Sequence, residues 1–164
     1  PGVGSTFWFT ARLKTGSTDA KPRFIAPVGD AEASLRRDHA GRRVLLVEDD
    51  QVNQLIALTL LEDVGLSVDV ADNGAAAVAC ARAHPYAVIL MDVQMPQMDG
   101  LEAARQIRSL AHHGRTPIVA ITANAFARDR ADCTQAGMND FIAKPFSPVE
   151  LYQTLLRWMA GPGA

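Results

Sequence analysis

Sulfur ligands and disulfides are almost absent from this sequence. Only two of its 164 residues are cysteine, Cys80 and Cys133. Both lie in segments with helical patterns and they form no Cys-x-x-Cys pair, so the sequence offers neither a disulfide framework nor a cysteine zinc site. We expect both thiols to be small buried hydrophobic side chains.

An excess of charge of either sign is also lacking, because 16 basic residues stand against 18 acidic ones. This near balance leaves no basic surface of the kind that binds nucleic acid or anionic membranes. Long hydrophobic runs are missing too, since Leu55–Leu61 is interrupted by Thr59 and falls far short of the roughly 20 residues of a membrane span. No signal peptide is visible. We therefore expect a soluble chain with no nucleic-acid partner and no membrane contact.

The composition changes near residue 42. Residues 15–41 are rich in Gly, Ser, Thr, Pro, Asp and Arg and contain few large apolar side chains, which predicts a linker. Apolar runs and helical patterns then alternate over residues 42–160, and residues 161–164 read as a tail. The length suits one globular domain of about 100–150 residues with additional segments.

Five short segments after residue 42 have the patterns of strands. Three are continuous apolar runs rich in branched residues, typical of strands buried on both faces of a parallel sheet: Arg43–Val47, Ala87–Met91 and Pro117–Ile121. Ser67–Ala71 alternates instead, and Asp140–Ala143 is short. We expect these two strands to form the edges of the sheet.

Helical patterns fill the gaps between the strands, at Gln51–Val64, Asn73–Ala83, Leu101–Leu110 and Val149–Met159. A further segment, Arg128–Ala136, is much more polar, and we expect it to be loosely packed and largely exposed.

The first of these helices carries an apolar stripe. Five of its residues follow the i, i+3, i+4, i+7, i+8 spacing of one helix face: Val52, Leu55, Ile56, Thr59 and Leu60. We expect this face to be buried and Gly65 to end the helix as a C-terminal cap.

Strands and helices that alternate in this way predict an open α/β fold with right-handed crossovers. Placing the two expected edge strands outside gives a flavodoxin-like, doubly wound (βα)5 parallel sheet with strand order 2-1-3-4-5. In such sheets ligands bind beyond the carboxyl ends of the strands, at the switch point between strands one and three.

Acidic residues stand at that predicted switch point. Glu48 and Asp49 follow the first strand, and Asp92 follows the third. Crowded carboxylates repel one another and require a compensating cation. Oxygen ligands with no nearby His or Cys favour Mg²⁺, with Mn²⁺ as an alternative. Thr122 and Lys144 follow the fourth and fifth strands, so a hydroxyl and an ammonium should face the same crevice and hold a phosphoryl group.

Several of these residues have simpler interpretations. Asp50 is expected to cap the following helix, and Asp99-Gly100 to form a turn that opens the next one. The loop from Met95 to Met98 is expected to pack, with Pro96 stiffening it. A metal site at the adjacent histidines His112-His113 has little support, because neighbouring side chains do not easily bind one ion without other ligands.

Four stretches occur in order between Arg42 and about Met159: LLVEDDQVN, ILMDVQMPQMDG, VAITANA and DFIAKPF. They resemble the opening strand with its acidic pair, the phosphoacceptor loop, the threonine strand and the lysine strand of the response-regulator receiver domain of two-component phosphorelays. Four motifs in the same order make this resemblance very specific.

The resemblance implies a role for each site residue. Asp92 is similar to the phosphoacceptor, Asp49 to a direct magnesium ligand and Glu48 to a ligand that acts through water. Gln94 is expected to offer its backbone carbonyl to the metal. The reaction implied is transfer of a phosphoryl group from a phosphohistidine to Asp92, by a domain that catalyses its own phosphorylation and dephosphorylation.

The later motifs imply a switch. Thr122 and Lys144 are similar to the residues that bind the phosphoryl oxygens, and the Lys144–Pro145 bond is expected to be cis. Phe141 takes the place of the family's switching aromatic residue, which is often tyrosine. Phosphorylation would draw Thr122 inward, let Phe141 turn and repack the surface of residues 128–136. Gln94 and Asn124 match variable positions that tune hydrolysis of the acyl phosphate.

The amino-terminal stretch GVGSTFWFT, within residues 1–14, resembles the last turn and closing strand of a histidine-kinase ATP-binding domain. The resemblance implies that this chain comes from a hybrid sensor kinase, in which the receiver follows the kinase core. It further implies that the chain lies in the cytoplasm and that the parent kinase is anchored in the inner membrane. The implied partner is a histidine-phosphotransfer domain or the phosphohistidine of the kinase core, and weak self-association is a further expectation. We expect the isolated strand to be disordered or to pair with a neighbouring chain.

Three other functions compete with a phosphoacceptor. A haloacid-dehalogenase-like phosphatase needs a second acid two residues after its aspartate nucleophile, where this sequence has Gln94. A flavodoxin-like electron carrier needs a phosphate-binding loop rich in Ser, Thr and Gly after the first strand, whereas Glu48, Asp49 and Asp50 would repel a flavin phosphate. An unphosphorylated binding module is disfavoured because all the acceptor residues are present.

Overall fold

A computed structural model describes residues 28–123 and 127–160 of the chain. The predicted kinase strand (1–14), the first part of the predicted linker (15–27), Asn124 and the predicted tail (161–164) lie outside the described residues.

Five parallel strands form one sheet in the order β2-β1-β3-β4-β5, as predicted. The strands are β1 (Arg43–Val47), β2 (Ser67–Ala71), β3 (Val88–Asp92), β4 (Ile118–Thr122) and β5 (Asp140–Ala143). Two of them end one residue later than their apolar runs indicated, because Asp92 pairs with Ile121 and Thr122 pairs with Ala143. Asp92 and Thr122 are therefore held by the sheet itself.

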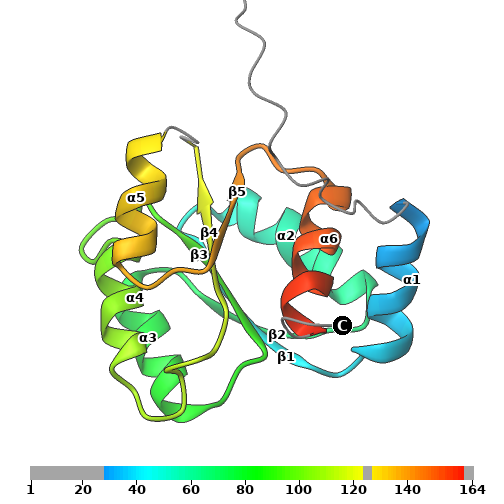
Figure 1. Ribbon diagram of the computed structural model, residues 1–164, viewed down its shortest axis with the longest axis horizontal. Helices are drawn as coiled ribbons and strands as arrows, with labels where there is room; N and C mark the ends of the chain where they lie inside the picture. The colour runs from blue at the N-terminus through cyan, green and yellow to red at the C-terminus, as the bar shows by residue number, and fades with distance from the viewer. Residues whose placement is uncertain (1–27, 124–126, 161–164) are drawn as a thin grey trace, which may run out of the picture.

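Helices cover both faces of the sheet (Figure 1). On one side lie α3 (Gly74–Ala83), α4 (Gly100–Arg108) and α5 (Ala127–Gln135), and on the other α1 (Val28–Asp38), α2 (Gln51–Asp63) and α6 (Pro148–Met159). The hydrophobic core is correspondingly divided into two clusters, one on each side of the sheet. Within the described part of the chain, no helix has the length and apolar character needed to cross a membrane.

The rotation of α2 differs from the prediction. Val52, Leu55 and Ile56 are 66%, 65% and 51% exposed, whereas Ala57 and Leu61 are buried. The helix is apolar on two sides, so its spacing alone does not decide which side faces the sheet. Its first turn decides, because side chains from that turn reach back to the end of β1 (see below). The prediction of a buried stripe through Val52, Leu55 and Ile56 is thus wrong.

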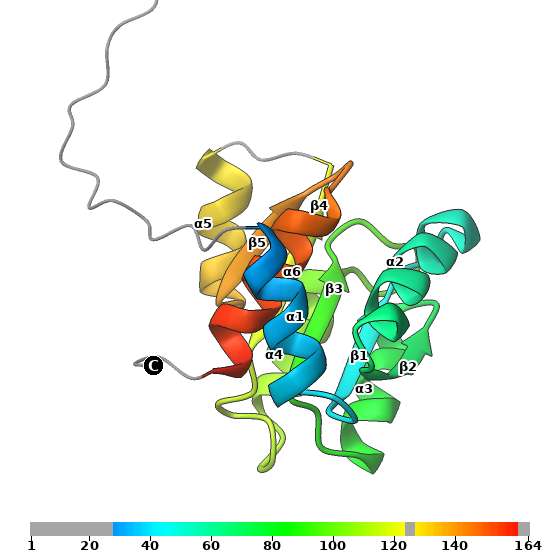
Figure 2. The same cartoon turned by 90° about the vertical axis from the view of Figure 1, so that its right-hand side faces the viewer.

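A second difference concerns the predicted linker. Residues Val28–Asp38 form α1, which lies beside α6 (Figures 1 and 2). Ala31 and Leu35, one helical turn apart, are buried in the same core cluster as Leu155 and Met159 of α6. The apolar pattern of this mostly polar helix was too weak to predict that it packs against α6. The linker prediction is therefore wrong for residues 28–38.

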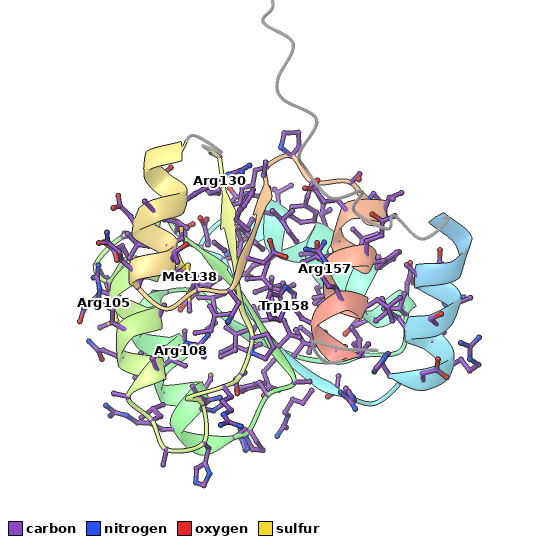
Figure 3. All side chains as sticks on the ribbon, viewed as in Figure 1. Arg105, Arg108, Arg130, Met138, Arg157 and Trp158 are labelled. Carbon is purple, nitrogen blue, oxygen red and sulfur yellow. The ribbon has the colours of Figure 1, made fainter. Side chains whose placement is uncertain are left out.

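Arg108, at the end of α4, ties together the loops at the amino-terminal edge of the sheet (Figure 3). Its guanidinium donates to the backbone oxygens of Gly137 at 2.8 Å, His113 at 2.8 Å and Thr116 at 2.5 Å, and to Oδ1 of Asn139 at 2.5 Å. Four acceptors around one planar donor group fix the entry of the chain into β4 and β5.

We expect Leu35→Ala to lower the free energy of unfolding by about 2–5 kcal/mol, because it leaves a cavity between α1 and α6. Urea unfolding monitored by circular dichroism measures this change. The control is Arg36→Ala, which removes only an exposed ion pair with Glu32 and should change stability by less than about 1 kcal/mol. Equal stability of the two variants would show that α1 does not pack in solution.

Candidate functional site

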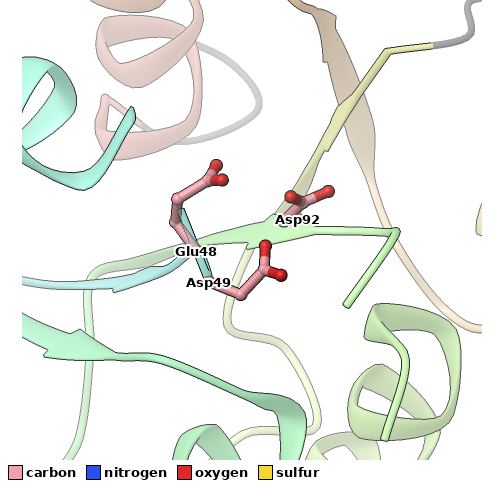
Figure 4. A group of neighbouring side chains, drawn as sticks. All are labelled: Glu48, Asp49 and Asp92. Atoms are coloured by element: carbon pink, nitrogen blue, oxygen red, sulfur yellow. The ribbon is translucent and has the colours of Figure 1, made fainter. Parts of the chain in front are cut away.

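Three carboxylates converge where β1 and β3 end (Figure 4). Glu48 and Asp49 follow β1, Asp92 is the last residue of β3, and the two strands are paired neighbours. One oxygen from each carboxylate lies within 4.8 Å of the other two. Glu48 and Asp92 are only 2% and 4% exposed, while Asp49 is open to solvent. This is the only such acidic, histidine or cysteine cluster among the residues that the structure describes.

Lys144 follows β5 and reaches two of these acids. Its Nζ lies 2.6 Å from Oε2 of Glu48 and 2.7 Å from Oδ2 of Asp92. Burial lowers the pKa of Lys144, but hydrogen bonds to Asp92 and Glu48 outweigh burial and raise it above its ordinary value. The ammonium is therefore a permanent positive charge in the site. Against three ionised carboxylates it leaves a formal excess of two negative charges.

Glu48 is the most enclosed of the acids. Burial raises the pKa of its carboxyl, while hydrogen bonds from Lys144 and Asn53 oppose this rise. Oε1 accepts from Nδ2 of Asn53 at 3.1 Å and from Nζ of Lys144 at 2.9 Å. The backbone N–H of Glu48 donates to the oxygen of Ala71 at 3.0 Å, which continues the β1–β2 pairing beyond the strand.

The loop after Asp92 is built around two contacts with that residue. The backbone N–H of Gln94 donates to Oδ1 of Asp92 at 3.0 Å. Gly100, the first residue of α4, lies so close to the backbone oxygen of Asp92 that a Cβ atom would overlap with it. Only glycine allows the loop to close this tightly. Asp99 and Gly100 were expected to form a turn that opens the helix; in the structure Asp99 is the cap of α4 and accepts from the N–H of Glu102 at 2.8 Å.

Thr122 and Lys144 lie side by side at the end of the sheet. The backbone N–H of Lys144 donates to the oxygen of Thr122 at 2.8 Å, which extends the β4–β5 pairing. Thr122 is buried. The Lys144–Pro145 peptide bond is cis, as predicted. The site residues expected from strands one, three, four and five therefore meet at one edge.

Phe141 lies on β5 beneath a cation from α5. The guanidinium carbon of Arg130 is 3.7 Å from the centroid of the Phe141 ring, and Arg130 points from α5 toward β5 (Figure 3). The ring is half-buried and packs partly against the core. Arg130 and Phe141 line a pocket of about 320 Å³ together with Thr134, Met138, Asn139 and Asp140.

Two polar residues of α2 contact the site although the sequence did not predict a role for them. Asn53 donates to the Glu48 side chain, and Nε2 of Gln54 donates to the Glu48 backbone oxygen at 2.5 Å. Asp50 caps the same helix, as predicted, by accepting from the N–H groups of Val52 and Asn53 at 2.9 Å. A signal was available in the sequence: both amides occupy positions where an amphipathic helix that packs on a sheet normally has apolar residues.

The histidine pair is not a metal site. His113 is completely buried, and its Nε2 lies 2.8 Å from the backbone oxygen of Ala81 and 3.1 Å from that of His84. Its Nδ1 lies 3.0 Å from Oγ1 of Thr116. The buried ring of His113 thus ties the loop before β4 to the end of α3.

Comparison with known proteins agrees with this geometry. Residues 44–156 match the family model of the response regulator receiver domain. The sensor histidine kinase GacS of Pseudomonas protegens is 45% identical over 119 residues, which are 71% of this chain and 13% of the kinase. The histidine-protein kinase BarA of Escherichia coli is 41% identical over 120 residues, 73% of this chain and 13% of that protein. The chain thus spans about an eighth of the length of these relatives.

Solved structures show the same fold. The receiver domain of sensor histidine kinase PA1611 from Pseudomonas aeruginosa PAO1, crystallised with a magnesium ion coordinated in its active-site cleft, is 45% identical and superposes with a TM-score of 0.71 over 74% of this chain and 100% of that one. The chemotaxis protein CheY4 of Vibrio cholerae is 31% identical, with a TM-score of 0.70 over 72% of this chain and 98% of CheY4. On its sequence match and its fold, this chain belongs to the response regulator receiver domain family.

Proposed function

We propose that this chain accepts a phosphoryl group from a phosphohistidine onto Asp92 in a magnesium-dependent reaction. The observation that carries the proposal is the convergence of Glu48, Asp49 and Asp92 at the switch point of the sheet, where Lys144 pairs with the first and the last of these acids. An oxygen of Asp92 forms the new O–P bond, the N–P bond breaks, and the imidazole nitrogen keeps the bonding electrons. A family relationship together with a complete acidic site supports this reaction.

The donor set suits magnesium. Three carboxylates and one ammonium leave two excess negative charges, which a divalent cation would balance, and the ligand atoms are all oxygen. We infer that Glu48, Asp49, Asp92 and the backbone carbonyl of Gln94 hold the ion. When bound, Mg²⁺ neutralises charge on the transferring phosphoryl oxygens; Mn²⁺ would serve the same purpose. The magnesium ion in the PA1611 receiver supports this assignment.

The remaining residues would bind the incoming group. Lys144 already lies 2.7 Å from Asp92 and would stabilise a phosphoryl oxygen without moving far. Thr122, from the neighbouring strand, would donate its hydroxyl to another oxygen. Gln94 stands where a haloacid-dehalogenase-like phosphatase needs its second acid, and the acids after β1 would repel a flavin phosphate, so both of those alternatives remain disfavoured.

The exposed face of α2 fits a partner that brings the phosphohistidine. Val52, Leu55 and Ile56 form an apolar patch on the helix that begins directly after the acids. The first turn of α2 has no acidic residue, and the acids of the helix, Glu62 and Asp63, lie in its last turn, so the three side chains of the patch carry no charge. We propose that a histidine-phosphotransfer domain, or the phosphohistidine segment of the kinase core, docks here.

The relatives suggest where the chain acts. GacS and BarA are named as a sensor histidine kinase and a signal-transduction histidine-protein kinase. We propose that this chain is the receiver of a hybrid sensor kinase and works in the cytoplasm. The prediction that residues 1–14 close an ATP-binding domain belongs to the same proposal.

The contact between Arg130 and Phe141 supports a switch. A cation over an aromatic face stabilises the ring position by about 0.5–1 kcal/mol at an exposed site. We propose that Arg130 holds Phe141 in its unphosphorylated position, and that phosphorylation turns the ring inward and repacks the surface of residues 128–136.

Asp92→Asn is expected to abolish labelling by acetyl phosphate with Mg²⁺, because the amide is not a nucleophile for phosphorus. Intact mass and a phosphate-affinity gel detect the acyl phosphate. Asp99→Asn is the matched control and should be labelled like the wild type, since Asn also caps a helix. Labelling of Asp92→Asn at the wild-type rate would exclude Asp92 as the acceptor.

Ile56→Glu is expected to slow phosphotransfer from a phosphorylated histidine protein by about tenfold or more, because it places a charge in the centre of the apolar patch. Labelling by acetyl phosphate, which needs no docking, should stay unchanged. Ala79→Glu adds the same charge at an exposed position of α3, on the other side of the sheet, and should leave both reactions intact. Equal slowing by both variants would refute docking on α2.

Arg130→Ala is expected to tighten beryllofluoride binding by about two- to fivefold, because losing about 0.5–1 kcal/mol of cation–π energy favours the inward ring. Titration followed by the NMR signals of Phe141 gives the affinity. Arg105→Ala, which removes an exposed arginine of α4, should have no effect. Unchanged or weaker binding in Arg130→Ala would contradict a locking role.

A further inference from the structure

We propose that Asn53 is a positioning residue that keeps the Glu48 carboxylate in place for the divalent cation while Lys144 turns to the phosphoryl group. This inference rests on the proposed function and concerns a residue that does not touch phosphorus itself. It starts from one contact, the 3.1 Å hydrogen bond from Nδ2 of Asn53 to Oε1 of Glu48.

Glu48 depends on very few donors. Its carboxylate is nearly inaccessible to water, and among the residues that the structure describes its side-chain donors are Asn53 and Lys144, the latter at 2.6 Å to Oε2 and 2.9 Å to Oε1. A buried carboxylate that loses its donors is strongly destabilised. Water therefore cannot take the place of either donor at this buried carboxylate.

One of these donors is shared. The same Nζ of Lys144 also lies 2.7 Å from Oδ2 of Asp92. A phosphoryl group on Asp92 would add roughly 1.5 to 2 negative charges at that point. Lys144 would then be drawn toward the phosphoryl oxygens and away from Glu48. Asn53 is the donor that remains.

The start of α2 aims Asn53 at Glu48. Asp50 accepts from the backbone N–H groups of Val52 and Asn53, both at 2.9 Å, which fixes the first turn. The residue three positions after a helix cap is commonly Glu or Gln, whose side chain returns to the cap. Here that position is Asn53, and its amide contacts Glu48 instead. Gln54 holds the backbone oxygen of Glu48 from the same turn.

The neutrality of the amide matters. A lysine or arginine at position 53 would hold Glu48 equally well, but its charge would oppose a divalent cation at the same acids. An amide donates a hydrogen bond without adding charge. Outer residues that orient metal ligands typically change metal affinity by 10–100-fold when they are lost.

The test measures Mg²⁺ affinity by isothermal titration calorimetry with no phosphoryl donor present, on the whole chain. Asn53→Ala should weaken Mg²⁺ binding by about tenfold or more, and Asn53→Gln, which restores an amide, should recover part of the loss. Gln51→Ala removes an exposed amide from the same turn and should bind Mg²⁺ like the wild type. At saturating Mg²⁺, acetyl phosphate should also label Asn53→Ala more slowly than the wild type, because Asn53 is the donor left to Glu48 once Lys144 turns to the phosphoryl group.

Unfolding midpoints of all variants accompany the titration, and Asn53→Ser is measured beside Asn53→Ala as a second variant that lacks the amide. Wild-type Mg²⁺ affinity in both Asn53→Ala and Asn53→Ser would overturn the inference, as would an equal loss in Gln51→Ala. If the wild type binds Mg²⁺ and is labelled on Asp92, such a result leaves the proposed function standing. A wild type that is not labelled at all would instead refute the proposed function.

Discussion

One ammonium group holds two buried carboxylates together at the end of the sheet, and the arrangement of the site depends on this contact. Nζ of Lys144 lies 2.6 Å from Glu48 and 2.7 Å from Asp92, and both acids are almost completely enclosed. Two buried negative charges at this distance would not be stable without a positive partner. The three residues come from the ends of three different strands, so the strand order is what makes the contact possible.

The helices that start at this edge serve the site as well as the fold. α2 and α4 begin with capping aspartates, and each first turn also contacts an acid or its backbone: Asn53 and Gln54 reach Glu48, and Gly100 lies against Asp92. Polar side chains therefore occupy the inner face of α2 near the site, and apolar ones, Ala57 and Leu61, occupy it farther on. The helix exposes Val52, Leu55 and Ile56 as a result.

The same features explain what the sequence could and could not predict. Three strands have continuous apolar runs, the two weaker strands fit the sheet edges, and the carboxyl ends of parallel strands meet at one end of the sheet, so the positions of Glu48, Asp49, Asp92 and Lys144 could be predicted. The buried face of α2 could not be predicted, because this helix is apolar on two sides. The amides of Asn53 and Gln54 decide its orientation, and a hydrophobic pattern does not take amides into account. α1 was missed because, from residue 31 of the helix onward, only Ala31 and Leu35 are buried apolar residues on a polar helix. Asn53 could not be predicted, because an uncharged amide on a helix is in most proteins a solvated surface residue.

The packing of α1 on α6 makes a helix that precedes the first strand part of the hydrophobic core. Ala31 and Leu35 lie in the same cluster as Leu155 and Met159 of the last helix. A protein cut just before β1 would leave this apolar surface of α6 open to water. The folded unit therefore begins at α1 and not at the first strand of the sheet.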